Sequence, residues 1–461
     1  MLDCLGKVAT TLGFDYNLPV VNGIVFLLCI AVAAAVIVAI FNIRNGLQAF
    51  LVGALLVSFP TVTTTLFYRF TTIYYGIAII FSVMAVYVLD KCKWGVLWSA
   101  LFSACALGIY QAYLPLTVTL MVLCLLRIAL DEKMAWGKVL KACLKCAAAL
   151  LLGLAVYALL LKVFLVVFHT QLSDYQGIDQ MGSYTLLGLA KSAWRAFQAC
   201  VLLPMNDYCG IASTPLLKIL YGLLYVLSGA VLLWAGFTRI KAPVPAMVFL
   251  CGCGLIPVAV GFIEVMCPDA YIHSVMIYSF ALLPVIPLVF LPYLPEKSRC
   301  AAWMRRGSLF LAAAILFCNG YYANVHDSSL YYTNRQVENY VNGIVTQVRM
   351  TEGFDTEKTW AMIGDLSDPL LNDRWSKANT YGATSSTSGF LETMSRMRWI
   401  ENYLGYQVPL ADDQTVAELE KSDVVSSMPL WPDQGSIRVV GEYVVIKFGE
   451  TSESESSIPS E

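Results

Sequence analysis

Long apolar segments recur along the first two thirds of the chain, and they constrain its fold more than any other feature. A helix needs about 20 mostly apolar residues to cross the hydrocarbon core of a bilayer. Ten candidate segments lie at 19–41, 47–60, 73–89, 95–109, 113–130, 146–168, 215–235, 245–263, 274–293 and 307–323. The second and the fourth are short, which favours tilted or broken helices there. The sequence therefore predicts an α-helical polytopic membrane protein with about ten transmembrane helices.

The composition and the distribution of charge support this class. Hydrophobic residues make up 58% of the chain and charged residues 13%, whereas soluble domains carry about 25% charged residues. Residues 1–324 hold 20 Lys and Arg against 11 Asp and Glu, and residues 325–461 hold 10 against 21. The positive charges are scattered between apolar segments and form no basic face, so nucleic acid is not an expected partner.

The basic residues in the short connections predict the orientation in the membrane. Alternate connections hold 14 Lys and Arg on one side and 4 on the other, and the richer side is expected to be cytoplasmic. Ten crossings then place residue 1 and the tail on the outer side. Because residues 1–18 show no signal peptide, we expect that a preceding transmembrane helix is missing, through a misplaced start or a truncation. Alternatively, the following helix alone translocates this short polar segment.

Three parts are expected along the chain: a transmembrane domain at 1–324, an extracytoplasmic α/β domain at 325–450, and a disordered tail at 451–461. In the second part, 328–350 has the pattern of an amphipathic helix and 358–365 that of a buried strand. Residues 437–448 read as a hairpin that turns at Gly441 and Glu442. All 14 Cys lie at or before Cys318, in spacings that indicate neither a zinc site nor a disulfide framework.

The outer connection at 169–214 is long enough to hold structure of its own. Leu187, Ala190, Trp194 and Phe197 fall near helical spacing, with basic residues between them. This pattern is typical of an amphipathic helix at the membrane interface. A packed re-entrant helix explains it equally well.

Several polar side chains of the outer connections are candidates for binding. Arg69 lies among aromatic residues that are ordinary interfacial anchors, or it binds an anionic group such as a lipid phosphate. Tyr110, Gln111 and Tyr113 either close a turn between two apolar helices or offer a surface for sugar hydroxyls. Lys162 either snorkels to the interface or meets a phosphate.

Acids on the outer side are candidate general bases. Asp174, Asp179 and Asp207 are more simply explained as solvated loop residues, whereas Glu264 and Asp269 join two apolar helices near the expected headgroup level. The three histidines are far apart, and no metal-ligand set, nucleotide-binding P-loop or GxSxG motif is present. No cofactor can be identified, and dependence on a divalent metal stays open.

Several motifs together resemble the Gtr-type (GtrII-like) membrane glucosyltransferases that modify bacterial O-antigens and other surface glycans, a family with the C-type glycosyltransferase (GT-C) fold. These are FPTVTTTLFYRFTTIYYGIAIIFSVMAVYVL at 59–89, ALGIYQAYLPL at 106–116, the long outer loop, and MPLWPDQGSIRVVGEYVVIKF at 428–448. The resemblance implies transfer of a hexose, expected to be glucose, from a polyprenyl-phosphate donor to a cell-surface glycan at the outer face of the cell membrane.

The resemblance also implies roles for particular residues. Arg69 and Lys162 would face the donor phosphate, Tyr110, Gln111 and Tyr113 would lie near sugar, and Glu264 and Asp269 would lie near the acceptor. In such enzymes an acid of the first outer loop is the base, and most of that loop would precede Met1 here. The base is therefore expected upstream of Met1, and Asp3 and Asp15 are the acids left in the loop.

Two other classes remain as alternatives. A transporter of lipid-linked glycans would share the membrane helices without bond chemistry, although the internal repeats common in transporters are not evident. A surface-polysaccharide polymerase would also be multi-spanning with large outer loops, but a folded outer C-terminal domain better suits a transferase.

Overall fold

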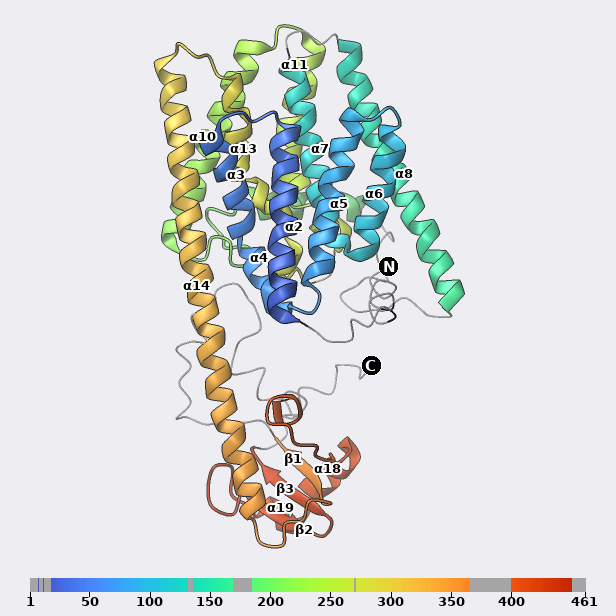
Figure 1. Cartoon of the computed structure of the whole chain (residues 1–461), viewed down its shortest axis with the longest axis vertical. Helices are drawn as coiled ribbons and strands as arrows, with labels where there is room; N and C mark the ends of the chain where they lie inside the picture. The colour runs from blue at the N-terminus through green and yellow to red at the C-terminus, as the bar shows by residue number, and fades with distance from the viewer. Residues whose placement is uncertain are drawn as a thin grey trace. The chain divides into compact units, whose positions relative to one another are not determined.

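The computed structural model describes residues 7, 11, 18–131, 136–168, 185–268, 271–364 and 399–449. It divides into two compact units, Met1–Ala323 and Asn324–Glu461. The first unit is a helical bundle and the second holds a small sheet (Figure 1).

The first unit is built almost entirely from helices. They are α2 (Pro19–Ile40), α3 (Gly46–Ser58), α4 (Pro60–Thr65), η1 (Leu66–Tyr68), α5 (Thr72–Lys91), α6 (Gly95–Ile109), η2 (Gln111–Tyr113), α7 (Leu114–Ala129), α8 (Trp136–Phe168), α9 (Leu186–Val201), α10 (Pro215–Arg239), α11 (Pro243–Val260), α12 (Ile263–Met266), η4 (Ser274–Met276), η5 (Tyr278–Leu282), α13 (Val285–Phe290), η6 (Leu291–Tyr293) and the start of α14 (Arg299–Met350). Capping side chains start several of them. The hydroxyl of Thr214, for example, accepts the N–H of Leu217 at the start of α10.

Seven helices of the described ranges are long and apolar enough to cross a membrane. The pair Gly46–Ser58 and Pro60–Phe67, bent by 40°, makes an eighth if it is counted as one span. Helix α6, with 15 residues, is apolar but shorter. A helical polytopic membrane protein is thus what the structure supports, and the count of ten crossings stays a prediction.

The apolar segment at 274–293 does not form one regular helix, so that expectation is wrong. It is a chain of short pieces, η4, η5, α13 and η6, because Pro284, Pro287 and Pro292 cannot donate backbone hydrogen bonds and clash with a continuing helix. Irregular backbone at bilayer depth requires burial within protein. Every residue of α13 is buried accordingly.

Polar side chains from α3 and α4 bond to this irregular backbone. The Gln48 side-chain amide donates to the carbonyl of Leu288. The Thr61 hydroxyl donates to the carbonyl of Ser274 at 2.8 Å. These buried polar residues within apolar helices therefore replace hydrogen bonds that a regular helix would have made.

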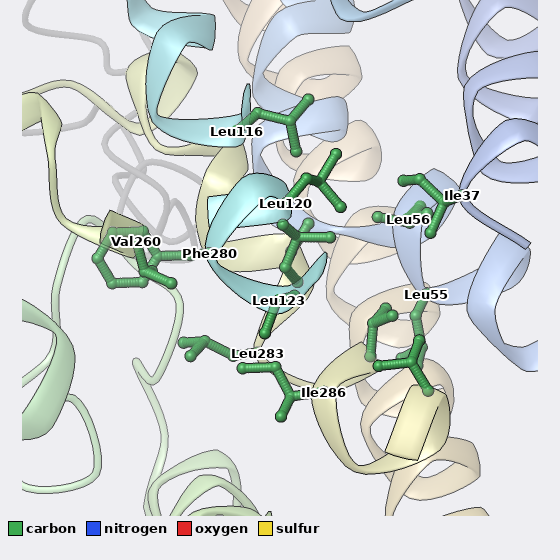
Figure 2. Close-up of a cluster of buried hydrophobic side chains, with 14 of the residues drawn as sticks. Ile37, Leu55, Leu56, Leu116, Leu120, Leu123, Val260, Phe280, Leu283 and Ile286 are labelled. Carbon is green, nitrogen blue, oxygen red and sulfur yellow. The ribbon is translucent and has the colours of Figure 1, made fainter. Parts of the chain in front are cut away.

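The core of the first unit lies where α7 meets residues 274–293, the broken segment (Figure 2). Leu116, Leu120 and Leu123 follow one another along α7, and all three are fully buried. They pack with residues of α2, α3, α11 and the broken segment, namely Ile37, Leu55, Leu56, Val260, Phe280, Leu283 and Ile286. The broken segment is thereby fixed in the middle of the bundle.

Helix α9 combines features of both interpretations of the outer loop. Ser192, Ala196 and Cys200 are buried on one face, and the helix packs against α11 and α12. Leu187 and Trp194, on the opposite face, are 67% and 58% exposed. The helix therefore packs on the bundle through small residues, and its apolar face points away from the bundle.

The second unit pairs the later part of α14 with a three-stranded sheet. The strands are β1 (Thr359–Ile363), β2 (Ile437–Val440) and β3 (Tyr443–Lys447), in the order β1-β3-β2. Strands β2 and β3 form the expected hairpin, and β1 pairs with β3 in parallel. Its core joins α14 residues such as Val341 to Trp360 and Ile446. Two short helices, α18 (Asp413–Glu420) and α19 (Asp423–Ser426), complete the described part.

Candidate functional site

The turn between α6 and α7 forms part of a cluster of tyrosines. The rings of Tyr75 and Tyr110 are stacked, with centroids 4.5 Å apart. Tyr113 lies edge-on to Tyr75 and to Tyr278, at 6.1 Å from each. Helix α5 begins near Tyr75 and ends at Lys91, and α6 runs back from Gly95 to Ile109, just before the turn. The cluster therefore lies at the end of the bundle opposite the lysine-rich connections.

Gln111 links this cluster to α8. Its side-chain amide donates to the hydroxyl of Tyr157 at 3.0 Å, and Gln111 is half-buried. The neighbouring Tyr113 is 1% exposed, and its hydroxyl has no hydrogen-bond partner among the described residues. The cluster, defined as Tyr75, Tyr110, Gln111, Tyr113, Tyr157 and Tyr278, thus combines aromatic faces with an amide and several hydroxyls.

Glu264 is held by a tyrosine that the sequence did not single out. The Tyr208 hydroxyl donates to Glu264 Oε1 at 2.7 Å, and the Tyr208 ring stacks on Phe280 at 5.2 Å. Burial, together with the negative charge of Glu264, raises the pKa of Tyr208 far above its ordinary value. Tyr208 therefore stays protonated and keeps donating to the carboxylate.

Element η5 connects Glu264 to the tyrosine cluster. Tyr278 of η5 contacts Tyr113, and Phe280, two residues further on, contacts Tyr208. The Tyr278 hydroxyl donates to the carbonyl of Leu56 at 3.1 Å, which anchors η5 to α3. The broken segment therefore links Tyr113 to Tyr208 and Glu264, which lie 95 and 151 positions later in the sequence.

The structure also describes the two candidate cations, Arg69 and Lys162. Arg69 is exposed, and its Nε donates to the carbonyl of Leu66 at 3.2 Å within its own turn. Lys162 is exposed on α8, five residues after Tyr157. Within the described ranges, neither cation makes a hydrogen bond to the tyrosine cluster. Their roles toward a phosphate stay predictions.

Of the other candidate acids, Asp207 is the one that the structure describes. Asp207 accepts the N–H of Ala212 at 2.9 Å and closes its own loop, which is a structural role. Asp3, Asp15, Asp174, Asp179 and Asp269 lie outside the described residues. His273 caps η4 by accepting the N–H of Val275 through Nδ1, at 3.3 Å. Within the described part of the chain, no group of three or more His, Cys, Asp or Glu is placed to hold a metal ion.

Sequence reasoning found the turn at 110–113 and Glu264 but missed the residues that contact them. Tyr75 and Tyr278 lie near the starts of apolar segments, Tyr157 lies inside one, and Tyr208 lies in the long connection at 169–214. Their only signal was an excess of tyrosine on that side of the bundle. A sequence does not show which of these tyrosines meet.

These helices and this polar cluster define a polytopic membrane protein with a candidate site at one end of its bundle. The family described as glucosyl transferase GtrII matches residues 1–284 of the chain. The chain belongs to this family, which confirms the resemblance seen in its motifs and places it among the glycosyltransferases. Searches of curated proteins and of solved structures give no match.

Proposed function

We propose that this chain is a GT-C-type transferase that moves a hexose, glucose by family, from a polyprenyl-phosphate carrier to a surface glycan at the outer face of the membrane. Membership of the glucosyl transferase family supports the class of reaction. The observation that carries the location is the tyrosine cluster, at the end of the bundle away from the basic connections. That end faces outward if the basic connections are cytoplasmic.

The cluster has the chemistry that a sugar requires. Aromatic faces such as those of Tyr75 and Tyr110 pack against the C–H groups of a pyranose. The Gln111 amide and the tyrosine hydroxyls supply hydrogen bonds to its hydroxyl groups. The buried Tyr113 hydroxyl, which lacks a partner among the described residues, can be satisfied by a substrate hydroxyl.

We assign the donor phosphate to Arg69 and the base to an acid at the same end. A guanidinium suits a phosphate oxygen because it offers several donors in fixed geometry. Glu264 is linked to the cluster through Tyr208 and η5, and in this proposal it takes the proton of the acceptor hydroxyl. The acceptor oxygen then attacks the anomeric carbon, and the bond from that carbon to the phosphate oxygen breaks with its electron pair leaving on the phosphate.

The proposal is tested with membranes that contain the full chain, a radiolabelled polyprenyl-phosphate glucose and acceptor glycan. We expect Glu264→Gln to lower transfer by about 100-fold or more, the range for loss of a general base. Arg69→Ala and Gln111→Ala should each lower transfer by about tenfold or more, as expected for the loss of one charged or buried hydrogen bond. Lys191→Ala is the matched control, because Lys191 is an exposed cation of α9 without a role here.

Each result separates one part of the proposal from another. Unchanged transfer in Arg69→Ala disposes of the donor-phosphate role, and unchanged transfer in Glu264→Gln disposes of Glu264 as the base. If the wild-type chain moves the carrier across the bilayer without forming labelled glycan, it is a transporter. If it lengthens the glycan by repeat units, it is a polymerase, and the proposed transfer is wrong in both cases.

A further inference from the structure

A cavity of about 320 Å³ lies between α5, α7 and α8, near the lysine-rich connection that follows α7. One part of its wall is apolar and includes Val86, Met121 and Leu125. The rest is basic, so the cavity is amphipathic in the way that a lipid with a charged headgroup is. It is formed by the opposite ends of α5 and α7 from those that carry the tyrosine cluster.

Three lysines of α8 line this cavity. Lys138, Lys141 and Lys145 are spaced by three and four residues, which places them on one face of the helix. Within the described ranges, none of the three forms an ion pair with a carboxylate, and Lys145 is half-buried. Positive charges that are gathered and unpaired in this way attract an anion.

The acid in the wall does not compensate these lysines. Asp90 is already engaged by Arg127, at 3.1 Å, and by Lys91, at 3.3 Å. Among the described residues, its carboxylate is therefore paired with two other cations and with none of the three lysines. The cavity as a whole keeps an excess of positive charge.

Arg127 supplies an unused buried donor in the same wall. Its side chain is 11% exposed, and Nη1 donates to the carbonyl of Ile40 at 2.7 Å. Its Nε is buried and has no hydrogen-bond partner among the described residues. A buried guanidinium donor of this kind is rarely left unpaired in a native protein.

We propose that this cavity binds an acidic phospholipid of the bilayer, with its phosphate among Lys138, Lys141, Lys145 and Arg127. Its acyl chain lies along the apolar wall. Basic pockets between membrane helices have this chemistry. Enrichment of lysine on the cytoplasmic side explains how many cations are present, but not why they line a cavity around a buried donor. A free phosphate would leave the apolar wall exposed to water. The proposal is independent of the transferase reaction.

The test measures how much lipid the purified full chain retains in detergent, by native mass spectrometry. The probes are phosphatidylglycerol, phosphatidylcholine and inorganic phosphate. The main variant replaces the three lysines together, Lys138→Gln, Lys141→Gln and Lys145→Gln. The matched control, Lys93→Gln with Lys241→Gln and Lys297→Gln, removes the same charge from connections that do not line the cavity.

We expect the wild type to retain phosphatidylglycerol at least tenfold better than phosphatidylcholine. Each lysine near an anionic headgroup contributes roughly fivefold in affinity, so the main variant should lose at least tenfold while the control keeps its lipid. Leu125→Trp leaves all cations in place and fills the cavity, and it should also lose the lipid. Arginine at the three lysine positions should restore retention, which would show that charge rather than folding is responsible.

Three outcomes overturn the proposal. The first is equal retention of the two phospholipids by the wild type. The second is an equal loss in the control, which would indicate general attraction to a basic surface. The third is displacement of phosphatidylglycerol by millimolar inorganic phosphate, which would make the site one for a soluble phosphate group.

Discussion

At the end of the bundle that carries the tyrosine cluster, burial determines the protonation of single side chains. Tyr208 stays protonated because burial and Glu264 both disfavour its ionised form. Cys209, the next residue, donates its thiol to the carbonyl of Ile272 at 3.3 Å. Burial, with the charges of Glu264 and Asp207, raises the pKa of Cys209 to about 12. The same few residues therefore share one electrostatic environment around Glu264.

This environment predicts that Cys209 is unreactive. A free thiol ionises near pH 8.5, whereas the thiol of folded Cys209 stays protonated until about pH 12, and only the thiolate is alkylated rapidly. Since only the unfolded chain ionises this thiol between those pH values, its contribution also lowers stability as pH rises through that window. We expect iodoacetamide at pH 8.5 to modify exposed Cys92 at least tenfold faster than Cys209, as read by mass spectrometry of the folded protein. Equal rates would contradict the burial of Cys209.

At the same scale, the sequence located some site residues and missed their partners. The turn at Tyr110, Gln111 and Tyr113 is visible because polar residues interrupt two apolar segments. Tyr157 and Tyr278 lie inside apolar segments, where a tyrosine has no special pattern. Only the packing of α8 and η5 against the turn brings their hydroxyls and rings to it.

At the scale of elements, close packing of α9 depends on a glycine. A Cβ on Gly261 would lie 2.5 Å from the carbonyl oxygen of Ala196, which is backbone and cannot rotate away. The buried face of α9 is made of small residues for the same reason. Helix α9 can approach the end of α11 this closely only while both sides lack bulk.

Gly261→Ala is therefore expected to destabilise the first unit by about 1–3 kcal/mol, the usual cost of forcing atoms into a packed interface. The measurement is the midpoint of thermal unfolding in detergent. Gly254→Ala is the control, because a Cβ there would meet nothing within 4 Å. It should leave the midpoint unchanged or raise it slightly, since alanine favours helix over glycine. A drop of equal size in both variants would show that the contact with Ala196 does not matter.

The broken segment shows why hydropathy alone misjudged one element. Residues 274–293 are as apolar as a spanning helix, yet three prolines and the hydrogen bonds from Gln48 and Thr61 hold them as short pieces. The prolines were visible in the sequence. The side chains that bond to this segment, Gln48 of α3 and Thr61 of α4, lie more than 200 residues away and could not be identified from the sequence.

At the scale of the whole molecule, the division of charge corresponds to the division into two units. The apolar, net basic part of the sequence forms the first unit, and the acidic, cysteine-free part forms the second. The GtrII family match covers residues 1–284 and so lies within the first unit. The second unit thus lies outside the matched residues.

The distribution of Lys and Arg between alternate connections predicts that two reporters lie on opposite sides of the membrane. Alkaline phosphatase fused after Gly449 should be active, because it needs an oxidising compartment to form its disulfides. The same enzyme fused after Lys241, in a basic connection, should be at least tenfold less active at equal expression. The reverse pattern would overturn both the orientation and the proposed outer-face reaction.

The sequence by itself determined the class of protein, the family, the position of most membrane helices and the hairpin of the second unit. These follow from local hydropathy, charge and turn residues, which act over short stretches of chain. Only the tertiary structure decided that 274–293 is broken, that Tyr208 holds Glu264, and that three lysines and Arg127 line one cavity. Those features depend on contacts between residues far apart in the sequence, and such contacts exist only once the helices are packed.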